Sequence, residues 1–282
     1  PTPVVLVAAA QPKSVTLSPS GSVATVAAAS VVTDRLMGCY PYFRSNFQAA
    51  LWSVDLTDPA APQSLGLLRI GSEQTFSVSS PAAADGILAI GYDVRETPEP
   101  ATPVVHSNLQ VFDVAPKSAP LARPPLDVPG PVTGITNLSS SSGLIWTLRN
   151  DNGTFRAEVC SYDGTDATML DGVAVSSTVL AVEKSSLFSG SSTGVSRYTL
   201  SPERLLSPAG TWALGSSPDQ IVIDNGFLIA KSGYKLFASD SFPSSGSQWT
   251  SSLWIPDLSL RSGTKSLLFP AGAFGVQIFP LD

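Results

Sequence analysis

Five acidic residues recur along this chain at broadly even intervals, each near a predicted crossover from one group of strands to the next. They are Glu73, Asp127, Asp171, Asp219 and Asp257. Carboxylate oxygens are the ligands that Ca²⁺ prefers, so five such side chains around one axis would form a cation site. Aspartate is also common in turns, where its side chain accepts hydrogen bonds from its own backbone. Both interpretations stay open.

A second candidate site is the segment 33–48, which concentrates aromatic residues outside any strand-like alternation. Its candidate anchors are Tyr40, Tyr42, Phe43, Arg44 and Phe47. Tyrosine and arginine are enriched where proteins bind partners. The alternative is that these aromatics fold back and close one end of the fold. A second long segment, 95–108, is rich in proline and acidic residues and brings His106 near its end. We predict that both segments are long loops on the same face.

The residues that enzymes need are scarce. His106 is the single histidine, so a Ser-His-Asp triad has only that residue to use as its base. The two cysteines, Cys39 and Cys160, have no zinc-site spacing, and we predict that they are not bonded to each other. No glycine-rich loop with a following lysine is present for phosphates. The sequence therefore favours a protein without catalysis, although it leaves the question open.

Composition and charge exclude two classes of partner. The chain has 282 residues, a net charge of −6, and 16 Lys and Arg residues that form no cluster. Nucleic-acid binding needs several clustered phosphate contacts, so we expect none. No apolar run reaches the roughly 18 residues of a membrane-spanning helix. Because the chain starts on Pro1, we expect either a processed protein or a piece of a longer chain or assembly.

A strand-like motif that ends in a polar turn repeats six times. The copies begin at Ala50, Asn108, Ala157, Gly194, Tyr234 and Gly275. This is roughly the 40–50-residue spacing of β-propeller blades. Two strand-like runs precede each copy and a fourth run follows each copy except the last. The pattern predicts an all-β protein, a single six-bladed β-propeller of four-stranded blades over residues 1–282. The N-terminal run "TPVVLVAAA" would supply the strand that the last blade lacks.

The first copy carries a family resemblance. "LWSVDLTDPAAPQSLG" resembles the bacterial LVIVD-type propeller repeat, in which a strand ending in Val-Asp precedes a Ser/Thr-Asp-Pro turn, and "LQVFDVAPKSAP" is a weaker match. The resemblance implies a β-propeller that is often exported or attached to the cell surface. It brings no catalytic residues.

Together these patterns favour a non-enzymatic binding or scaffold propeller outside the cytoplasm, whether secreted, periplasmic or on the cell surface. We expect it to recognise a protein or glycan partner through the face formed by segments 33–48 and 95–108. The alternative is a metal-dependent, lactonase-like hydrolase with Ca²⁺ held by the recurrent acids at the mouth of a central channel. No other cofactor is expected.

Overall fold

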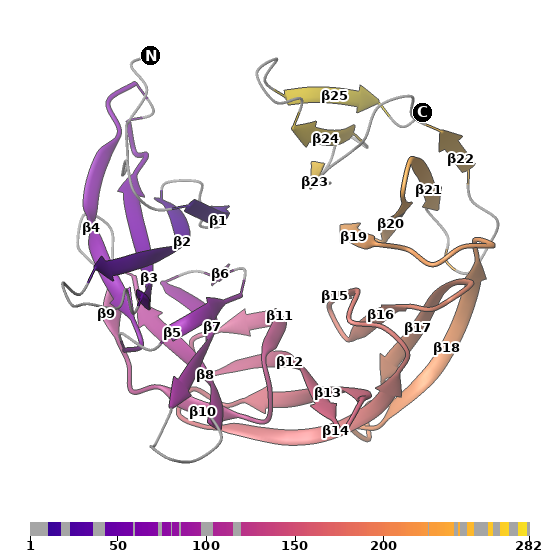
Figure 1. Ribbon diagram of the computed structural model, residues 1–282, viewed down its shortest axis with the longest axis horizontal. Coiled ribbons are helices and arrows are strands. Elements are labelled where there is room, and N and C mark those ends of the chain that lie inside the picture. Colours follow the sequence, from indigo (N-terminus) through magenta and orange to yellow (C-terminus); the bar gives the residue numbers. More distant parts are fainter. Residues whose placement is uncertain are drawn as a thin grey trace. The chain divides into compact units, whose positions relative to one another are not determined.

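The computed structural model consists of β-strands, and the part of the chain that it describes contains no helix (Figure 1). The described residues are 11–17, 23–35, 43–58, 60–72, 75–79, 81–84, 86–96, 104–114, 120–224, 226–239, 242, 247–250, 259–261, 266–270 and 276–280. Within them, no helix is long and apolar enough to cross a membrane. The predicted all-β class is therefore confirmed.

The chain divides into two compact units, residues 1–149 with 159–169, and residues 150–158 with 170–282. The first sheet of the first unit has four strands in chain order: β1 (Gln11–Leu17), β2 (Val23–Arg35), β3 (Phe43–Asp55) and β4 (Gln63–Ile70). β2 and β3 pair antiparallel over their whole length, from Val23 opposite Asp55 to Arg35 opposite Phe43.

The second sheet is built around one long hairpin. Its strands are β5 (Thr75–Val78), β6 (Ala82–Ala84), β7 (Ile87–Glu96), β8 (Val104–Asp113), β9 (Leu121–Ala122) and β10 (Leu126–Val128). β7 and β8 pair from Ile87 opposite Asp113 to Glu96 opposite Val104. β5 and β6 both pair with β7, while β9 and β10 both pair with β8. The hairpin is therefore the centre of the sheet.

The third sheet follows chain order, and the division between the two units falls within it. Its strands are β11 (Val132–Ser139), β12 (Ser142–Asp151), β13 (Thr154–Tyr162) and β14 (Ala167–Val175). The turn after β12 is Asn152 and Gly153, with φ of 52° and 91°. Two-residue hairpins need positive φ at both positions, and an Asn-Gly pair adopts it at low cost.

The remaining sheets belong to the second unit and again use strands that are consecutive in the chain. The fourth contains β15 (Leu180–Glu183), β16 (Ser186–Gly190), β17 (Gly194–Leu200) and β18 (Leu206–Ala213). The fifth contains β19 (Gln220–Asp224), β20 (Phe227–Ser232), β21 (Lys235–Ser239) and β22 (Ser247–Thr250). The sixth contains β23 (Ser259–Arg261), β24 (Ser266–Pro270) and β25 (Val276–Pro280). β19 and β20 form a hairpin in which Asp224 pairs with Phe227, and the Asp-Asn-Gly sequence between the strands is a strong hairpin signal.

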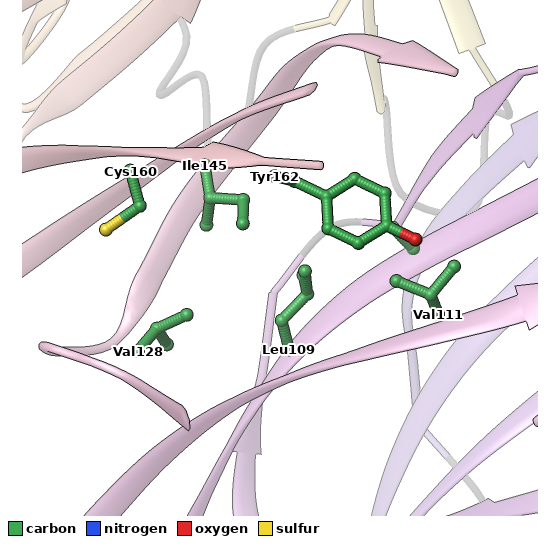
Figure 2. Packing of buried hydrophobic residues seen from close by; sticks show 7 residues of the cluster. Leu109, Val111, Val128, Ile145, Cys160 and Tyr162 are labelled. Atoms are coloured by element: carbon green, nitrogen blue, oxygen red, sulfur yellow. The ribbon is translucent and has the colours of Figure 1, made fainter. Parts of the chain in front are cut away.

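Two apolar clusters form the core of the first unit. The first contains Leu51, Ile70, Leu88, Ile90, Tyr92 and Phe112. The second contains Ala89, Leu109, Val111, Val128, Ile145, Cys160 and Tyr162. Figure 2 shows Leu109, Val111 and Val128 facing Ile145, Cys160 and Tyr162. Because successive residues of a strand point to opposite faces, β7 and β8 supply side chains to both clusters, and each buried Leu or Val contributes about 1.5–3 kcal/mol.

A third cluster forms the core of the second unit. It contains Phe188, Val195, Trp212, Ile221, Leu228, Ala230 and Phe237. The Trp212 and Phe237 rings meet edge to face with centroids 6.4 Å apart, a preferred aromatic geometry. It draws on the fourth and fifth sheets, so neighbouring sheets are held together by burial.

Side chains also tie neighbouring sheets to one another. Arg123, just after β9, donates to the Asp113 carboxylate, to the Tyr162 hydroxyl at 2.9 Å and to the backbone oxygens of Ser140 and Gly164 at 3.2 Å. The hydrogen bond from Arg123 is the main reason that the pKa of Asp113 lies below its usual value. This guanidinium therefore joins the second sheet to the third.

Two carboxylates act in a similar way in the second unit. Asp171 Oδ2 accepts from the Leu206 amide at 2.7 Å, which links β14 to β18. The Glu183 carboxylate accepts from the Gly226 amide at 3.0 and 3.1 Å, which links β15 to the turn before β20. Each bond satisfies a backbone group at a sheet end or turn.

The aspartates of the repeated motif stabilise turns. Asp55 Oδ1 accepts from the Thr57 amide at 2.8 Å. Asp163 Oδ1 accepts from the amides of Thr165 at 2.9 Å and Asp166 at 2.8 Å. Such bonds let an aspartate close a turn at the end of a strand. They explain locally why an acid recurs where these strands end.

The structure corrects the two predicted loops. Residues 33–35 and 43–48 of the segment 33–48 lie in β2 and β3, and residues 95–96 and 104–108 of the segment 95–108 lie in β7 and β8. In the first hairpin the backbone register places Asp34 opposite Arg44. Val104 and Val105 are β-branched and suit a strand. The described residues of both segments thus lie at the ends of long hairpins.

Candidate functional site

A polar pocket lies in the first unit, where the second sheet faces the end of β4. It has a volume of about 610 Å³. Its lining residues are Arg69, Gly71, Ser72, Tyr92, Val94, Glu96, His106, Asn108, Gln110, Pro125 and Asp127. Ligand pockets commonly have volumes of about 300–1,000 Å³, so this one is large enough for a small molecule or for side chains of a partner.

Strand register assembles the pocket wall. Asn108 in β8 stands opposite both Tyr92 in β7 and Asp127 in β10, so these three residues form one row across three strands. The next row along the hairpin pairs Val94 with His106. Along the same face of β7, Leu88 and Ile90 are fully buried in the core. The face therefore changes from apolar to polar toward the open end of the hairpin.

Gly71 brings the backbone after β4 against Tyr92. Its φ is +67°, and a Cβ there would lie 2.7 Å from Tyr92 Cε2 and 2.2 Å from Thr75 Oγ1. A glycine is needed because a side chain would both strain the backbone and strike its neighbours. The Ser72 amide then donates to Thr75 Oγ1 at 3.0 Å. This tight turn holds one edge of the pocket against the tyrosine.

Backbone oxygens fix the two amide side chains of the wall. Asn108 Nδ2 donates to the His106 oxygen at 3.4 Å. Gln110 Nε2 donates to the Arg123 oxygen and, at 3.3 Å, to the Val111 oxygen. Both residues are nearly buried. Their amide nitrogens are thus directed toward the protein.

The charged residues of the pocket are mostly acidic. Burial raises the pKa of Tyr92, and the negative charge of Asp127 raises it further. Asp127 itself is exposed on β10. Glu96 Oε2 lies 3.7 Å from His106 Nε2 at the exposed end of the hairpin. Arg69, at the end of β4, is also exposed. The phenol of Tyr92 therefore stays protonated, and the two carboxylates lie at separate positions along the wall.

The opposite face of the same hairpin buries a carboxyl group. Asp93, only 5% exposed, accepts from Ser107 Oγ at 2.7 Å. Burial raises the pKa of Asp93, while hydrogen bonds from Ser107 and Ser77 partly offset that effect. This face continues through Ala89 into the second apolar cluster, so Asp93 belongs to the interior rather than to the pocket.

The candidate aromatic anchors fall largely outside the described residues. Tyr40 and Tyr42 lie outside them, and Phe43, Arg44 and Phe47 are placed by backbone within β3. His106 is the one predicted binding residue that lines the pocket. The interpretation of 33–48 as a recognition surface remains a prediction.

The five recurrent acids do not share one environment. Glu73 and Asp257 lie outside the described residues, and Asp127 lines the pocket. Asp127 and Asp171 lie within β10 and β14. Asp171 accepts from the Leu206 amide, and Asp219 pairs with the buried Lys231 and accepts from the Gly233 amide at 2.8 Å. Hydrogen bonds from nearby groups thus account for two of these carboxylates.

The described residues bear only in part on the predictions about metal ligands and the two cysteines. Among the described residues, no three His, Cys, Asp or Glu side chains cluster as metal ligands. Cys160 is fully buried in β13, within the second apolar cluster. Cys39 lies outside the described residues, so the absence of a Cys39–Cys160 bond stays a prediction.

The sequence analysis missed most of the pocket wall. Tyr92 occurs in "AIGYDVRE", and Asn108 and Gln110 occur in "VHSNLQVF", two runs that look like strands. In the second run the polar residues His106, Asn108 and Gln110 occupy alternate positions. That alternation was a usable signal, because residues two apart on paired strands share a face. The register that aligns them with Asp127 depends on pairing with β10 and was not readable locally.

Comparison with known proteins gives no further identification. No known family model matches this chain, and no curated protein matches it. The function must therefore be argued from the site itself.

Proposed function

We propose that this chain is a non-enzymatic binding domain of the six-bladed propeller type, and that it recognises a protein or glycan partner outside the cytoplasm. The single observation that carries the binding role is the polar pocket beside the β7–β8 hairpin. It combines a tyrosine, two amides held by backbone bonds and an exposed carboxylate, spread over three adjacent strands. A few fixed polar groups in a concave site are typical of ligand recognition.

Support for the propeller comes from the succession of sheets. Each described sheet uses strands that are consecutive in the chain and antiparallel, and the last contains three described strands, β23, β24 and β25. A propeller repeats four-stranded sheets in this manner. Residues 1–10, which the proposal assigns to closing the last blade, lie outside the described residues. The resemblance of Leu51–Gly66 to LVIVD-type repeats supports the extracytoplasmic location.

Closure can be tested by deleting residues 1–8. If Val4 to Ala8 pairs with β25, the deletion removes buried valine and leucine side chains, each worth about 1.5–3 kcal/mol. We expect the free energy of unfolding to fall by several kcal/mol in chemical denaturation. An unchanged melting temperature would show that this segment does not close the fold.

The binding role can be tested without knowing the partner. The intact chain and an Asn108→Ala/Asp127→Ala variant would be applied to glycan and peptide arrays, with Asp166→Asn as an exposed control. We expect at least one probe class to be retained by the intact chain and the control and lost by the pocket variant. If no probe distinguishes them, the pocket is not a recognition site.

The lactonase-like alternative has weaker support. It needs several inward carboxylates that are available to a cation, whereas Asp171 and Asp219 already accept protein hydrogen bonds. Turnover of a lactone panel that depends on added Ca²⁺ would favour this alternative over the binding role.

A further inference from the structure

The pocket carries more carboxylates than guanidinium groups, because Glu96 and Asp127 line it beside Arg69. The amide nitrogens of Asn108 and Gln110 donate to the backbone oxygens of His106, Val111 and Arg123. Both N–H groups of Gln110 are thus used and Asn108 keeps one of its two, while the acceptors that the amides can offer a ligand are their oxygens. Asp127 adds a carboxylate to the same row, and an ionised carboxylate only accepts.

We propose that this pocket takes a cationic side chain, the guanidinium or ammonium group of a basic residue on a partner protein. The inference rests on the proposed binding role and names its ligand class. Arginine and lysine side chains carry five and three donors and no acceptor, which complements a wall of amide oxygens and carboxylates. Hydrogen bonds between ionised and neutral groups are also stronger than those between two neutral groups.

The aromatic residue of the pocket fits the same ligand. Tyr92 lines the pocket in the row of Asn108 and Asp127, and cations bind to tyrosine rings as well as to carboxylates. Its hydroxyl remains neutral at physiological pH, so the tyrosine adds no charge to the pocket. The tight turn at Gly71 lies close to the Cδ2 and Cε2 atoms of the ring.

The other charged side chains of the pocket are compatible with a bound cation. Arg69 is exposed, so its guanidinium can extend into solvent when a second cation enters. Glu96 lies near His106 at the outer end of the hairpin and adds a second carboxylate along the wall. At about 610 Å³ the pocket exceeds one side chain, which leaves space for residues that flank the basic one.

A neutral glycan is a poorer match to this wall. Each sugar hydroxyl both donates and accepts, so a saccharide site normally presents donors as well as acceptors. Here the two carboxylates only accept, and both N–H groups of the Gln110 amide are already used within the protein. A donor-only ligand satisfies the free oxygens without leaving acceptors of its own unpaired in a desolvated site.

The test is an NMR titration of the full ¹⁵N-labelled chain with short blocked peptides. The probes are acetyl-Gly-Arg-Gly-amide, its lysine counterpart, and a citrulline peptide that keeps the shape of arginine without its charge. We expect the two basic peptides to shift amides of β7, β8 and β10, and the citrulline peptide to bind at least about tenfold more weakly.

Two variants test whether the arginine peptide binds at the pocket. Asp127→Asn keeps the shape of the side chain and removes its charge, so we expect binding of the arginine peptide to weaken about tenfold or more. Asp166→Asn makes the same change at an exposed turn outside the pocket, and binding should remain as in the intact chain. Binding to the intact chain should also weaken as salt is raised, since exposed charges are screened.

Two results would overturn the inference in different ways. If citrulline binds as well as arginine, or if neutral oligosaccharides such as maltotriose or an N-acetylglucosamine trimer shift the same amides while the basic peptides do not, the cationic ligand is wrong and the binding role survives. If neither peptides nor oligosaccharides shift pocket amides, both the ligand class and the proposed function fail.

Discussion

Tyr92 and Asp93 are neighbours in β7, but their side chains lie on opposite faces of one sheet and serve different ends. On the first face Tyr92, Asn108 and Asp127 form a polar row that borders an open pocket. On the second, Asp93 and Ser107 are buried and bonded to each other, in line with the apolar cluster of Leu109 and Val111. A polar residue in these strands therefore marks a binding wall only when its face opens to solvent.

The largest expected effect lies on the buried face. Leu109 is fully buried in the second apolar cluster, so Leu109→Ala should leave a cavity and lower the free energy of unfolding by about 3 kcal/mol. Chemical denaturation would measure it. Leu121→Ala is the matched control, because Leu121 is 71% exposed and its truncation should change stability by less than about 0.5 kcal/mol. Equal losses in the two variants would contradict the proposed core.

The next effect concerns the turn that supports the pocket. Gly71→Ala adds a Cβ at a φ of +67°, 2.7 Å from the Tyr92 ring, and should cost about 2–3 kcal/mol. Gly86→Ala introduces a similar φ strain at +76° with nothing within 4 Å of the new Cβ, so it should cost only about 1 kcal/mol. The difference in unfolding free energy reports the contacts of the new Cβ with the Thr75 hydroxyl and the Tyr92 ring together. If the two variants are equally stable, the turn does not press on the tyrosine.

A smaller and pH-dependent effect belongs to the buried carboxyl. Burial raises the pKa of Asp93, so the folded state holds this proton more tightly than the unfolded state. Stability from this group is therefore fully present at low pH and is lost as pH rises through the folded pKa. Asp93→Asn keeps an acceptor for Ser107 and removes the charge. We expect it to stabilise the protein by about 1 kcal/mol at pH 7, with the gain shrinking toward pH 4.

Asp113 is a control, because its pKa shift has the opposite sign to that of Asp93. The hydrogen bond from Arg123 lowers the pKa of Asp113, so its contribution is present above the unfolded pKa and is lost as pH falls through the folded pKa. Asp113→Asn should therefore lose stability at neutral pH, with the loss shrinking in acid. Thermal melts from pH 3 to pH 8 would compare the variants. A stability gain at pH 7 in both would refute the assigned causes.

The fold class and many strand positions were predictable because they depend on local patterns. Alternation in "LIWTLRND" and "FRAEVCSY", with Asn-Gly between them, specifies a hairpin from neighbouring residues alone. The strand lengths were less predictable. Nothing local to 33–35 or 43–48 shows that Asp34 comes to stand opposite Arg44, because pairing depends on the partner strand.

The site was predictable only in part for the same reason. His106 and Asp127 were named as candidates, but their common pocket depends on the register of β10 on β8. The roles of Asp171 and Asp219 depend on partners remote in sequence, such as the Leu206 amide 35 residues away. Recurrent spacing of acids can therefore reflect recurrent turns and sheet ends as well as a shared metal site.

The smallest expected change in stability is at Asn108 on the pocket face, which is next in sequence to Leu109, where the largest change is expected. Asn108 adjoins Leu109 in the chain, yet among the described residues its side-chain amide donates only one long hydrogen bond of 3.4 Å, to the His106 oxygen. Asn108→Ala should therefore change the free energy of unfolding by less than about 1 kcal/mol. It removes an amide oxygen from the centre of the polar row, so binding of the arginine peptide should weaken about tenfold. Denaturation and NMR titration of the same sample would give both numbers. A stability loss near that of Leu109→Ala would mean that both faces of the hairpin are structural core, and the contrast between them would disappear.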